Sequence, residues 1–211
     1  MRVVIYGSRP DGHAKVVAEL AAEDSTVELV GLIDDFPENA ARTLRGLTVV
    51  GTGNDLSPRE PEDAQGLFLG FGESRGRAAI AERALQAGYE LPRLVHRSAQ
   101  ICASAQLGEG TQVLALTYIG PDARLGRGVL VNTGAIVEHD SVLEDGVVVG
   151  PGATLCGRVR VGREALVGAG ATILPDVVVG ASAVVGAGAL VREAVPDATL
   201  VAGVPARTVG S

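Results

Sequence analysis

The chain has 211 residues, which is enough for one large domain or for two small ones that each bury a core. Its hydrophobic content of 46% and charged content of 20% are typical of a globular protein, and no apolar run approaches the ~18 residues of a membrane span. The net charge of −7 gives no attraction for nucleic acid or an anionic membrane. We therefore expect a cytoplasmic protein without nucleic-acid or membrane partners.

The N-terminal segment, residues 1–92, alternates between strand and helix patterns. Buried strands are expected over 2–7, 26–35, 47–51 and 66–72, and helices over 12–24 and 74–88. This alternation predicts a small parallel α/β domain of the Rossmann type. The ligand of such a domain lies at the carboxyl ends of the strands.

Three features follow those strand ends. The loop "GSRPDGH" (7–13) lacks the spacing of a dinucleotide fingerprint, but Gly12, His13 and the following helix N-terminus could receive a phosphate. Alternatively, the loop only turns the chain and His13 is solvated. The pair Asp34 and Asp35 could accept hydrogen bonds from a base or a ribose, or it could cap the next turn. Gly72 lies at the end of the last strand.

A strict period of six begins at Val95 and continues without a slip through Val191. Every sixth position is aliphatic, and the position four residues later holds only Ala, Ser, Thr or Val. A period of six fits neither a helix nor a lone strand, but it fits a short strand followed by a corner. Three such sides close a coil of eighteen residues, so residues 93–211 are predicted to form a parallel β-helix.

Stacking predicts that residues eighteen apart lie in one column, about 4.8 Å per coil. Cys102 and Cys156 differ by 54 positions, so they share a column but lie three coils, about 14 Å, apart. That separation exceeds the reach of a disulfide. We expect two free, structural thiols.

The segment "AIVEHDSV" (135–142) places a histidine between two carboxylates inside this repeat. His139 is two positions past an aliphatic residue, so it should lie in a corner and point out of the coil. A neutral imidazole accepts a proton near neutral pH, and Glu138 or Asp140 could hold one ring nitrogen. The sequence leaves open which carboxylate does so. The alternative is a solvated corner residue with no catalytic role.

Taken together, the segments "IYG", "GHAKVV" and "GLIDD", the hexad repeats, "AIVEHD" and the tail "AGVPAR" resemble one known family. The chain is similar to the sialic acid O-acetyltransferase-like branch of hexapeptide-repeat acyltransferases, and most similar to N-acetyltransferases of UDP-linked 4-amino sugars. The resemblance implies a left-handed β-helix, acetyl-CoA as acyl donor, and a homotrimer with active sites between subunits. It also implies that the N-terminal domain binds the nucleotide part of the substrate.

The resemblance also implies site residues. His139 matches the general base, Asn132 and Glu138 match polar residues near it, and Asp140 matches a carboxylate that raises its basicity. The positions that match sugar-nucleotide contacts are Asp11, Gly12, His13, Asp34, Asp35 and Gly72. Ala169 and Ala187 match positions that line the acetyl-CoA channel. Two departures are a longer "GSRPDGH" loop and Val148, where some members have a histidine.

Other functions compete with the leading one. O-acetylation of sialic acid or a related sugar would use the same base. A scaffold with a small-molecule-sensing domain would have no need for the "EHD" segment. A zinc carbonic anhydrase on this fold needs three histidine ligands, whereas the repeat holds only His96 and His139. We therefore predict no metal site and an acetyl-CoA-dependent N-acetyltransferase acting on a nucleotide-linked amino sugar.

Overall fold

The computed structural model describes residues 1–9, 12–53, 56 and 64–209. Its contacts divide the chain into two units. The first comprises Met1–Gly72 and Ala79–Leu94, and the second comprises Glu73–Ala78 and Val95–Ser211. The predicted boundary lay at residues 92 and 93.

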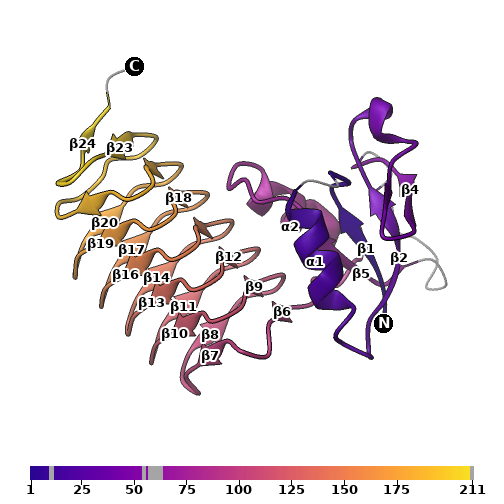
Figure 1. Ribbon diagram of the computed structural model, residues 1–211, viewed down its shortest axis with the longest axis horizontal. Coiled ribbons are helices and arrows are strands. Elements are labelled where there is room, and N and C mark those ends of the chain that lie inside the picture. The colour runs from indigo at the N-terminus through magenta and orange to yellow at the C-terminus, as the bar shows by residue number, and fades with distance from the viewer. Residues whose placement is uncertain (10–11, 54–55, 57–63, 210–211) are drawn as a thin grey trace. The chain divides into compact units, whose positions relative to one another are not determined.

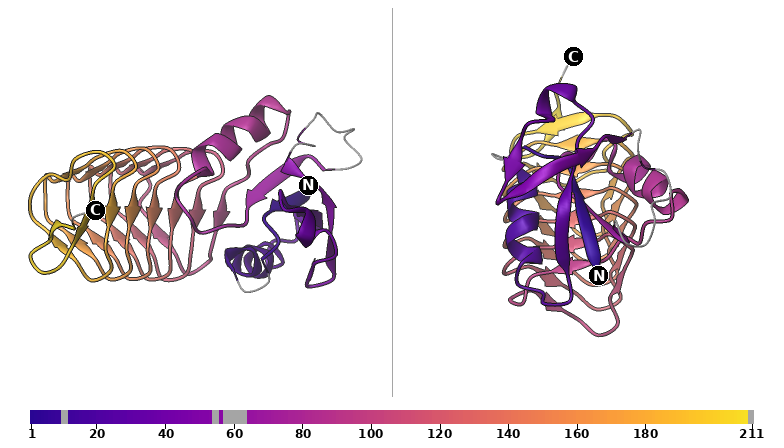
Figure 2. Two further views of the ribbon diagram at one scale, coloured as in Figure 1. Left: turned by 90° about the horizontal axis from the view of Figure 1, so that it is seen from above. Right: turned by 90° about the vertical axis from the view of Figure 1, so that its right-hand side faces the viewer.

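The first unit is built on a five-stranded sheet with the order β3-β4-β2-β1-β5. Its elements are β1 (Arg2–Tyr6), α1 (His13–Ala21), β2 (Glu28–Ile33), a 3₁₀ turn (Pro37–Asn39), β3 (Thr43–Leu44), β4 (Leu47–Gly51), β5 (Gly66–Leu69) and α2 (Arg77–Gln86), whose first two residues belong to the second unit. Strands β4, β2, β1 and β5 pair in parallel, as predicted. Figure 2 shows α1 and α2 on opposite sides of the sheet, so apolar side chains of β1 are buried on both faces.

A short antiparallel hairpin, β3 with β4, was missing from the sequence-based prediction. Its two-residue turn is Arg45–Gly46, and both residues have positive φ, 51° and 85°. Such a turn is usually signalled by Asn-Gly or Asp-Gly. An arginine at the first turn position hides that signal.

The second unit is a parallel β-helix of short strands (Figure 1). Its strands are β6 (Leu94–Val95), β7 (Gln100–Ile101), β8 (Gln106–Leu107), β9 (Gln112–Val113), β10 (Tyr118–Ile119), β11 (Arg124–Leu125), β12 (Leu130–Val131), β13 (Ile136–Val137), β14 (Val142–Leu143), β15 (Val148–Val149), β16 (Thr154–Leu155), β17 (Arg160–Val161), β18 (Leu166–Val167), β19 (Thr172–Ile173), β20 (Val178–Val179), β21 (Val184–Val185), β22 (Leu190–Val191), β23 (Leu200–Ala202) and β24 (Arg207–Thr208). From β6 to β22 every third strand belongs to the same sheet, which gives three parallel sheets. β23 then pairs with β21 in parallel, and β24 pairs with β23 in the antiparallel direction. The left view of Figure 2 shows the stacked coils.

The six-residue period of the sequence corresponds to one side of a coil, and each side contributes buried side chains to the core of the β-helix. Paired residues in adjacent coils differ by eighteen, as in Tyr118 with Ile136. The aliphatic positions from Val113 to Val191 and most of the small positions are buried in one cluster. The first three aliphatic positions are less buried, because they lie at the end of the stack: Val95 is 40% exposed, and Ile101 and Leu107 are partly buried.

Glycines after the strands let the coils approach closely. A Cβ atom on Gly150 would lie 2.7 Å from the backbone nitrogen of Ala169 in the next coil. Real Cβ contacts do not reach this distance, so a side chain here would force the coils apart.

The β-helix unit also buries a cation. The Arg77 side chain is fully buried, and its Nε donates a 2.8 Å hydrogen bond to the carbonyl oxygen of Gly128. Burial lowers the pKa of the Arg77 guanidinium to about 9. Its hydrogen bonds, including one to Oε1 of Gln112, attach the segment Glu73–Ala78 to the β-helix.

Within the described part of the chain, none of the helices has the length and apolar character needed to cross a membrane.

Candidate active site

The corner between β13 and β14 carries His139. Val137, the last residue of β13, is fully buried and anchors the start of this corner. The following residues turn outward, and Asp140 adopts a left-handed backbone conformation with a φ of 58°. The side chains of His139 and Asp140 are 45% and 55% exposed. The prediction that His139 points out of the coil is therefore confirmed.

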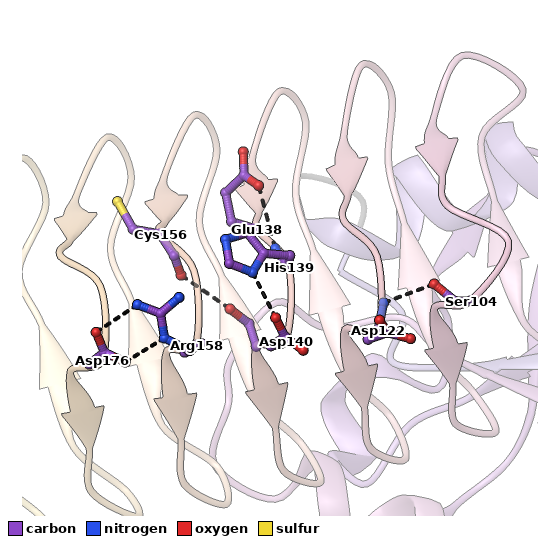
Figure 3. A network of polar contacts seen from close by, with 9 residues as sticks. Ser104, Asp122, Glu138, His139, Asp140, Cys156, Arg158 and Asp176 are labelled. Atoms are coloured by element: carbon purple, nitrogen blue, oxygen red, sulfur yellow. Dashed lines mark hydrogen bonds and ion pairs between the residues drawn. The ribbon is translucent and has the colours of Figure 1, made fainter.

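The two flanking carboxylates do different things (Figure 3). Asp140 Oδ2 lies 2.7 Å from His139 Nδ1, a short hydrogen bond to the ring. Glu138 instead accepts a long, 3.4 Å hydrogen bond from the backbone nitrogen of His139. The question that the sequence left open has an answer: Asp140 holds the imidazole.

The neighbouring coils leave room around the ring, as the eighteen-residue column predicts. The backbone nitrogen of Asp140 donates to Pro121 in one adjacent coil, and that of Arg158 donates to His139 from the other. A Cβ atom on Gly157 would lie 2.5 Å from His139 Nε2 and 2.7 Å from Cε1. The imidazole thus extends over Gly157 and occupies space that any other residue would fill.

Asn132, Ala169 and Ala187 lie on a different corner of the same chain. Asn132 follows β12, one coil side before His139. Hydrogen bonds from Gly152 to Thr133, from Gly170 to Pro151 and from Gly188 to Ala169 join this corner through successive coils. Ala169 and Ala187 are exposed and one coil apart. The β-helix therefore groups these three residues on one edge and His139 on another.

The thiol of Cys156 lies one coil from Glu138. Cys102 and Cys156 are free, as expected from their column separation. Burial raises the pKa of the Cys156 thiol, and the negative charge of Glu138 raises it further. The thiol is therefore less reactive at neutral pH than an exposed cysteine.

In the first unit, the carboxylates of Asp34 and Asp35 have opposite environments. Asp34 is 5% exposed and accepts four hydrogen bonds, from Ser8 nitrogen (3.0 Å), Ser8 hydroxyl, Phe36 nitrogen (3.0 Å) and Asn39 Nδ2 (2.7 Å). Burial acts to raise the pKa of the Asp34 carboxyl, but these hydrogen bonds outweigh it and the pKa is lowered. Asp34 thus fastens the loop after β1 to the end of β2. A substrate contact for Asp34 stays a prediction.

Asp35 is exposed at the same edge of the sheet. It accepts hydrogen bonds from the Tyr6 hydroxyl and from the backbone nitrogen of Gly53 at 2.7 Å. Burial and the hydrogen bond to Asp35 raise the pKa of the Tyr6 hydroxyl. Arg83 Nη2 donates to the carbonyl oxygen of Gly53 and extends the network.

Of the other predicted substrate-binding residues, Gly12, His13 and Gly72 lie near one another. Gly12 is the N-cap of α1, and His13 is its first residue. A Cβ atom on Gly72 would lie 3.8 Å from the Cβ of His13, so the ends of β5 and of the first loop meet. Asp11 lies outside the described residues.

Several site residues were missed in the sequence. Tyr6, Ser8 and Gly53 organise the two aspartates, yet each lies in a strand or turn whose pattern already had a structural explanation. Gly157 was not missed, because the eighteen-residue column predicts that it lies directly beside His139.

The chain was compared with known proteins. Residues 2–84 match the PglD N-terminal domain family, and residues 140–175 and 158–193 match the bacterial transferase hexapeptide repeat. No curated protein sequence matches the chain.

Solved structures match almost its whole length. A perosamine N-acetyltransferase from Caulobacter crescentus, in complex with CoA and GDP-perosamine, is 35% identical, with a TM-score of 0.90 over 100% of this chain and 98% of that one. The PglB acetyltransferase domain from Neisseria gonorrhoeae FA1090, in complex with acetyl coenzyme A, is 37% identical, with a TM-score of 0.89 over 99% and 98%. WeeI from Acinetobacter baumannii AYE, at 24% identity, TM-score 0.83 and 99% and 100% coverage, shows the fold alone.

The chain belongs to the hexapeptide-repeat N-acetyltransferases of amino sugars. This confirms the family that the sequence resembled, together with the Rossmann-like domain and the left-handed β-helix. It also confirms that the protein is an acyltransferase.

Proposed function

We propose that this acetyltransferase transfers the acetyl group of acetyl-CoA to the amino group of a nucleotide-linked sugar, with His139 as general base. The observation that carries the proposal is the 2.7 Å hydrogen bond between His139 Nδ1 and Asp140 Oδ2 on an exposed corner. A histidine held this way has one ring nitrogen fixed and the other available.

The hydrogen bond selects the tautomer. A carboxylate only accepts hydrogen bonds, so Nδ1 carries the proton and Nε2 carries the lone pair. Nε2 lies beside Gly157, which has no side chain of its own. Asp140 also stabilises the positive charge that develops when Nε2 takes a proton.

In the proposed acetyl transfer, His139 takes up one proton and later releases it. The acceptor amine attacks the thioester carbon and a C–N bond forms, while its proton passes to His139 Nε2. The C–S bond then breaks, and the sulfur leaves as the CoA thiolate. The imidazolium returns the proton to that thiolate, so the products are an amide and CoA and His139 is regenerated neutral.

The positions of the other predicted residues support an active site shared between subunits. Asn132, Ala169 and Ala187 occupy one edge of the β-helix, and His139 occupies another. A homotrimer in which the two edges face each other would bring base and acyl donor together. Small exposed side chains at Ala169 and Ala187 leave space for an extended pantetheine arm. The trimer and a cytoplasmic location stay predictions.

We assign the nucleotide part of the acceptor to the carboxyl edge of the N-terminal sheet. Asp35, His13 and Gly72 lie there, and the PglD N-terminal domain match covers this unit. Our sequence-based prediction was a UDP-linked 4-amino sugar. The similar perosamine N-acetyltransferase was solved with GDP-perosamine. A GDP-linked amino sugar is therefore the alternative acceptor to test against the UDP-linked one.

Isothermal titration of the protein with UDP and with GDP tests the acceptor class. Tighter binding of UDP supports our prediction, whereas tighter binding of GDP replaces it. Asp35→Asn is expected to weaken binding of the preferred nucleotide about tenfold, and Glu38→Gln, which changes an exposed carboxylate three positions beyond Asp35, serves as its control. Binding of neither nucleotide would contradict the assignment.

A further inference from the structure

A column of four charged side chains crosses the corner that carries His139. Its members lie eighteen residues apart: Asp122, Asp140, Arg158 and Asp176. All four line one groove of about 570 Å³ on this edge of the β-helix. Figure 3 shows them side by side in successive coils.

The backbone at these four residues is left-handed. All four have positive φ, from 58° to 64°, a conformation that costs a non-glycine residue about 1 kcal/mol or more. At the equivalent position of another corner the chain has glycine in four successive coils, namely Gly134, Gly152, Gly170 and Gly188. The corner of His139 therefore presents four successive charged side chains where that other corner presents none.

Several carboxylates lie near His139. Glu138 and Asp140 are its chain neighbours, Asp122 lies one coil away, and Asp176 interacts electrostatically with His139. Negative charges favour the protonated imidazole, and an imidazolium cannot accept a proton. A general base in this setting therefore needs a nearby positive charge that limits the effect.

Arg158 is that charge. Its backbone nitrogen donates a 2.9 Å hydrogen bond to the carbonyl oxygen of His139, so it occupies the coil adjacent to Asp140. Its guanidinium, however, is directed to the next coil, where Nε and Nη2 bind Oδ1 and Oδ2 of Asp176 at 2.6 and 2.9 Å. Asp140 is left to bind the histidine.

Two carboxylates, one coil to either side, thus compete for one guanidinium. A direct pair with Asp140 would occupy the carboxylate that holds His139 Nδ1 and would weaken the base. The bidentate pair with Asp176 fixes Arg158 at a distance at which it offsets the carboxylates without displacing the histidine.

We propose that Arg158 and Asp176 are positioning residues that tune the basicity of His139 through Asp140. Arg158 limits the protonation of His139 at neutral pH, and Asp176 keeps Arg158 from pairing with Asp140. The inference rests on the proposed role of His139 as the base. Two further cations, Arg124 and Arg160, line the same groove from the neighbouring strands, and both are unchanged in every variant compared below. The Cys156 thiol and the Tyr118 hydroxyl near this corner are uncharged at neutral pH.

The test is a double-mutant cycle read from the pH dependence of kcat/KM. In the profile of kcat/KM against pH, activity rises with a midpoint at which His139 loses its proton. Arg158→Gln is expected to move this midpoint to higher pH by about 0.5–1 unit, because no arginine then offsets the carboxylates that stabilise the protonated imidazole. Asp176→Asn is expected to move it to lower pH by a similar amount and to lower kcat about threefold to tenfold with KM unchanged. In the Arg158→Gln background, Asp176→Asn is expected to shift the midpoint by less than half as much, because only the direct interaction between Asp176 and His139 is then lost.

Asp122→Asn is the matched control. It removes the same charge from the same column, but Asp122 lies closer to Asp140 than Asp176 does and holds no arginine. Its effect should be smaller than that of Asp176→Asn and unchanged by Arg158→Gln. Equal shifts for the two aspartates, both additive with Arg158→Gln, would overturn the proposal, because the column would then act only through distance.

A second readout separates this inference from the proposed function. The chain has three histidines, so the imidazole resonances of His139 can be assigned by comparison with His139→Ala and titrated by NMR. The same opposite shifts in the NMR titration support the tuning network even if His139→Ala retains activity. Unshifted NMR midpoints overturn it even if His139 proves to be the base.

Discussion

His139 Nδ1 lies 2.7 Å from Asp140 Oδ2, and this contact leaves Nε2 as the ring atom that can accept a proton. The equally close Glu138 binds only the backbone of the same residue. The two carboxylates that flank the histidine in the sequence are therefore not equivalent, and their substitutions should differ.

Asp140→Asn is expected to lower kcat about tenfold to a hundredfold with little change in KM. The amide keeps the shape of the side chain but does not stabilise the imidazolium, and it can bind the wrong tautomer. Glu138→Gln is the matched control and should cost less than threefold. Steady-state kinetics with acetyl-CoA and an amino-sugar acceptor measure both. A larger loss for Glu138→Gln would reverse the roles assigned to the two carboxylates.

Gly157→Ala is expected to lower kcat about tenfold to a hundredfold and to leave the free energy of unfolding nearly unchanged. The new Cβ would lie 2.5 Å from His139 Nε2, so the exposed ring must rotate away. Gly152→Ala has open space but a φ of 65°, so it should lose about 1 kcal/mol of stability and keep its activity. Kinetics and urea unfolding of both variants provide the comparison, and a loss of stability without loss of activity in Gly157→Ala contradicts the steric account.

Glu138→Gln is expected to speed alkylation of Cys156 by iodoacetamide about twofold to threefold at pH 8. Burial and the Glu138 charge both raise the pKa of this thiol, so removing the charge increases the reactive thiolate. The measurement uses a Cys102→Ser background, in which Cys156 is the remaining cysteine. Glu109→Gln, on a distant coil, should leave the rate unchanged. Slower alkylation in Glu138→Gln would contradict the assigned cause.

Asp34→Asn is expected to reduce the free energy of unfolding of the N-terminal unit by about 1–3 kcal/mol at pH 7, because four donors lose a carboxylate acceptor. The folded-state pKa of Asp34 is lowered, so its contribution is complete above the unfolded value of about 3.9 and is lost as pH falls through the folded value. The difference between wild type and variant should therefore shrink below about pH 4. Thermal unfolding from pH 3 to 7 measures it, and exposed Glu38→Gln should show no such dependence. A difference that stays constant down to pH 3 would refute the assignment.

The repeat made much of the fold predictable, because a column of buried aliphatic side chains leaves one residue in six with little freedom. The same arithmetic predicted that Gly157 and Pro121 flank His139 and that the two cysteines stay apart. It did not reveal which carboxylate binds the ring, since Glu138 and Asp140 are each one residue away. The structure distinguishes them, because Asp140 contacts Nδ1 of the ring and Glu138 contacts the backbone nitrogen.

In the N-terminal unit, the strands could be predicted from the sequence, but the roles of the two candidate substrate-binding aspartates could not. Asp34 and Asp35 looked alike in the sequence, yet one is buried under four hydrogen bonds and the other is exposed. The difference arises from Ser8, which is 26 residues from Asp34, and from Asn39, which is five residues from it, and neither residue belongs to a motif. The Arg158–Asp176 pair was missed for a related reason: a spacing of eighteen identifies neighbours, but not which of two carboxylates an arginine binds.

The central claim is that His139 is the base for acetyl transfer to a nucleotide-linked amino sugar. The most direct test follows CoA release from acetyl-CoA with a thiol reagent for wild type and His139→Ala, with UDP- and GDP-linked 4-amino sugars and free sialic acid as acceptors. We predict release with a nucleotide-linked amino sugar that falls by about 10² or more in the variant. Equal rates for the two proteins would contradict the role of His139, and release only with sialic acid would contradict the acceptor class.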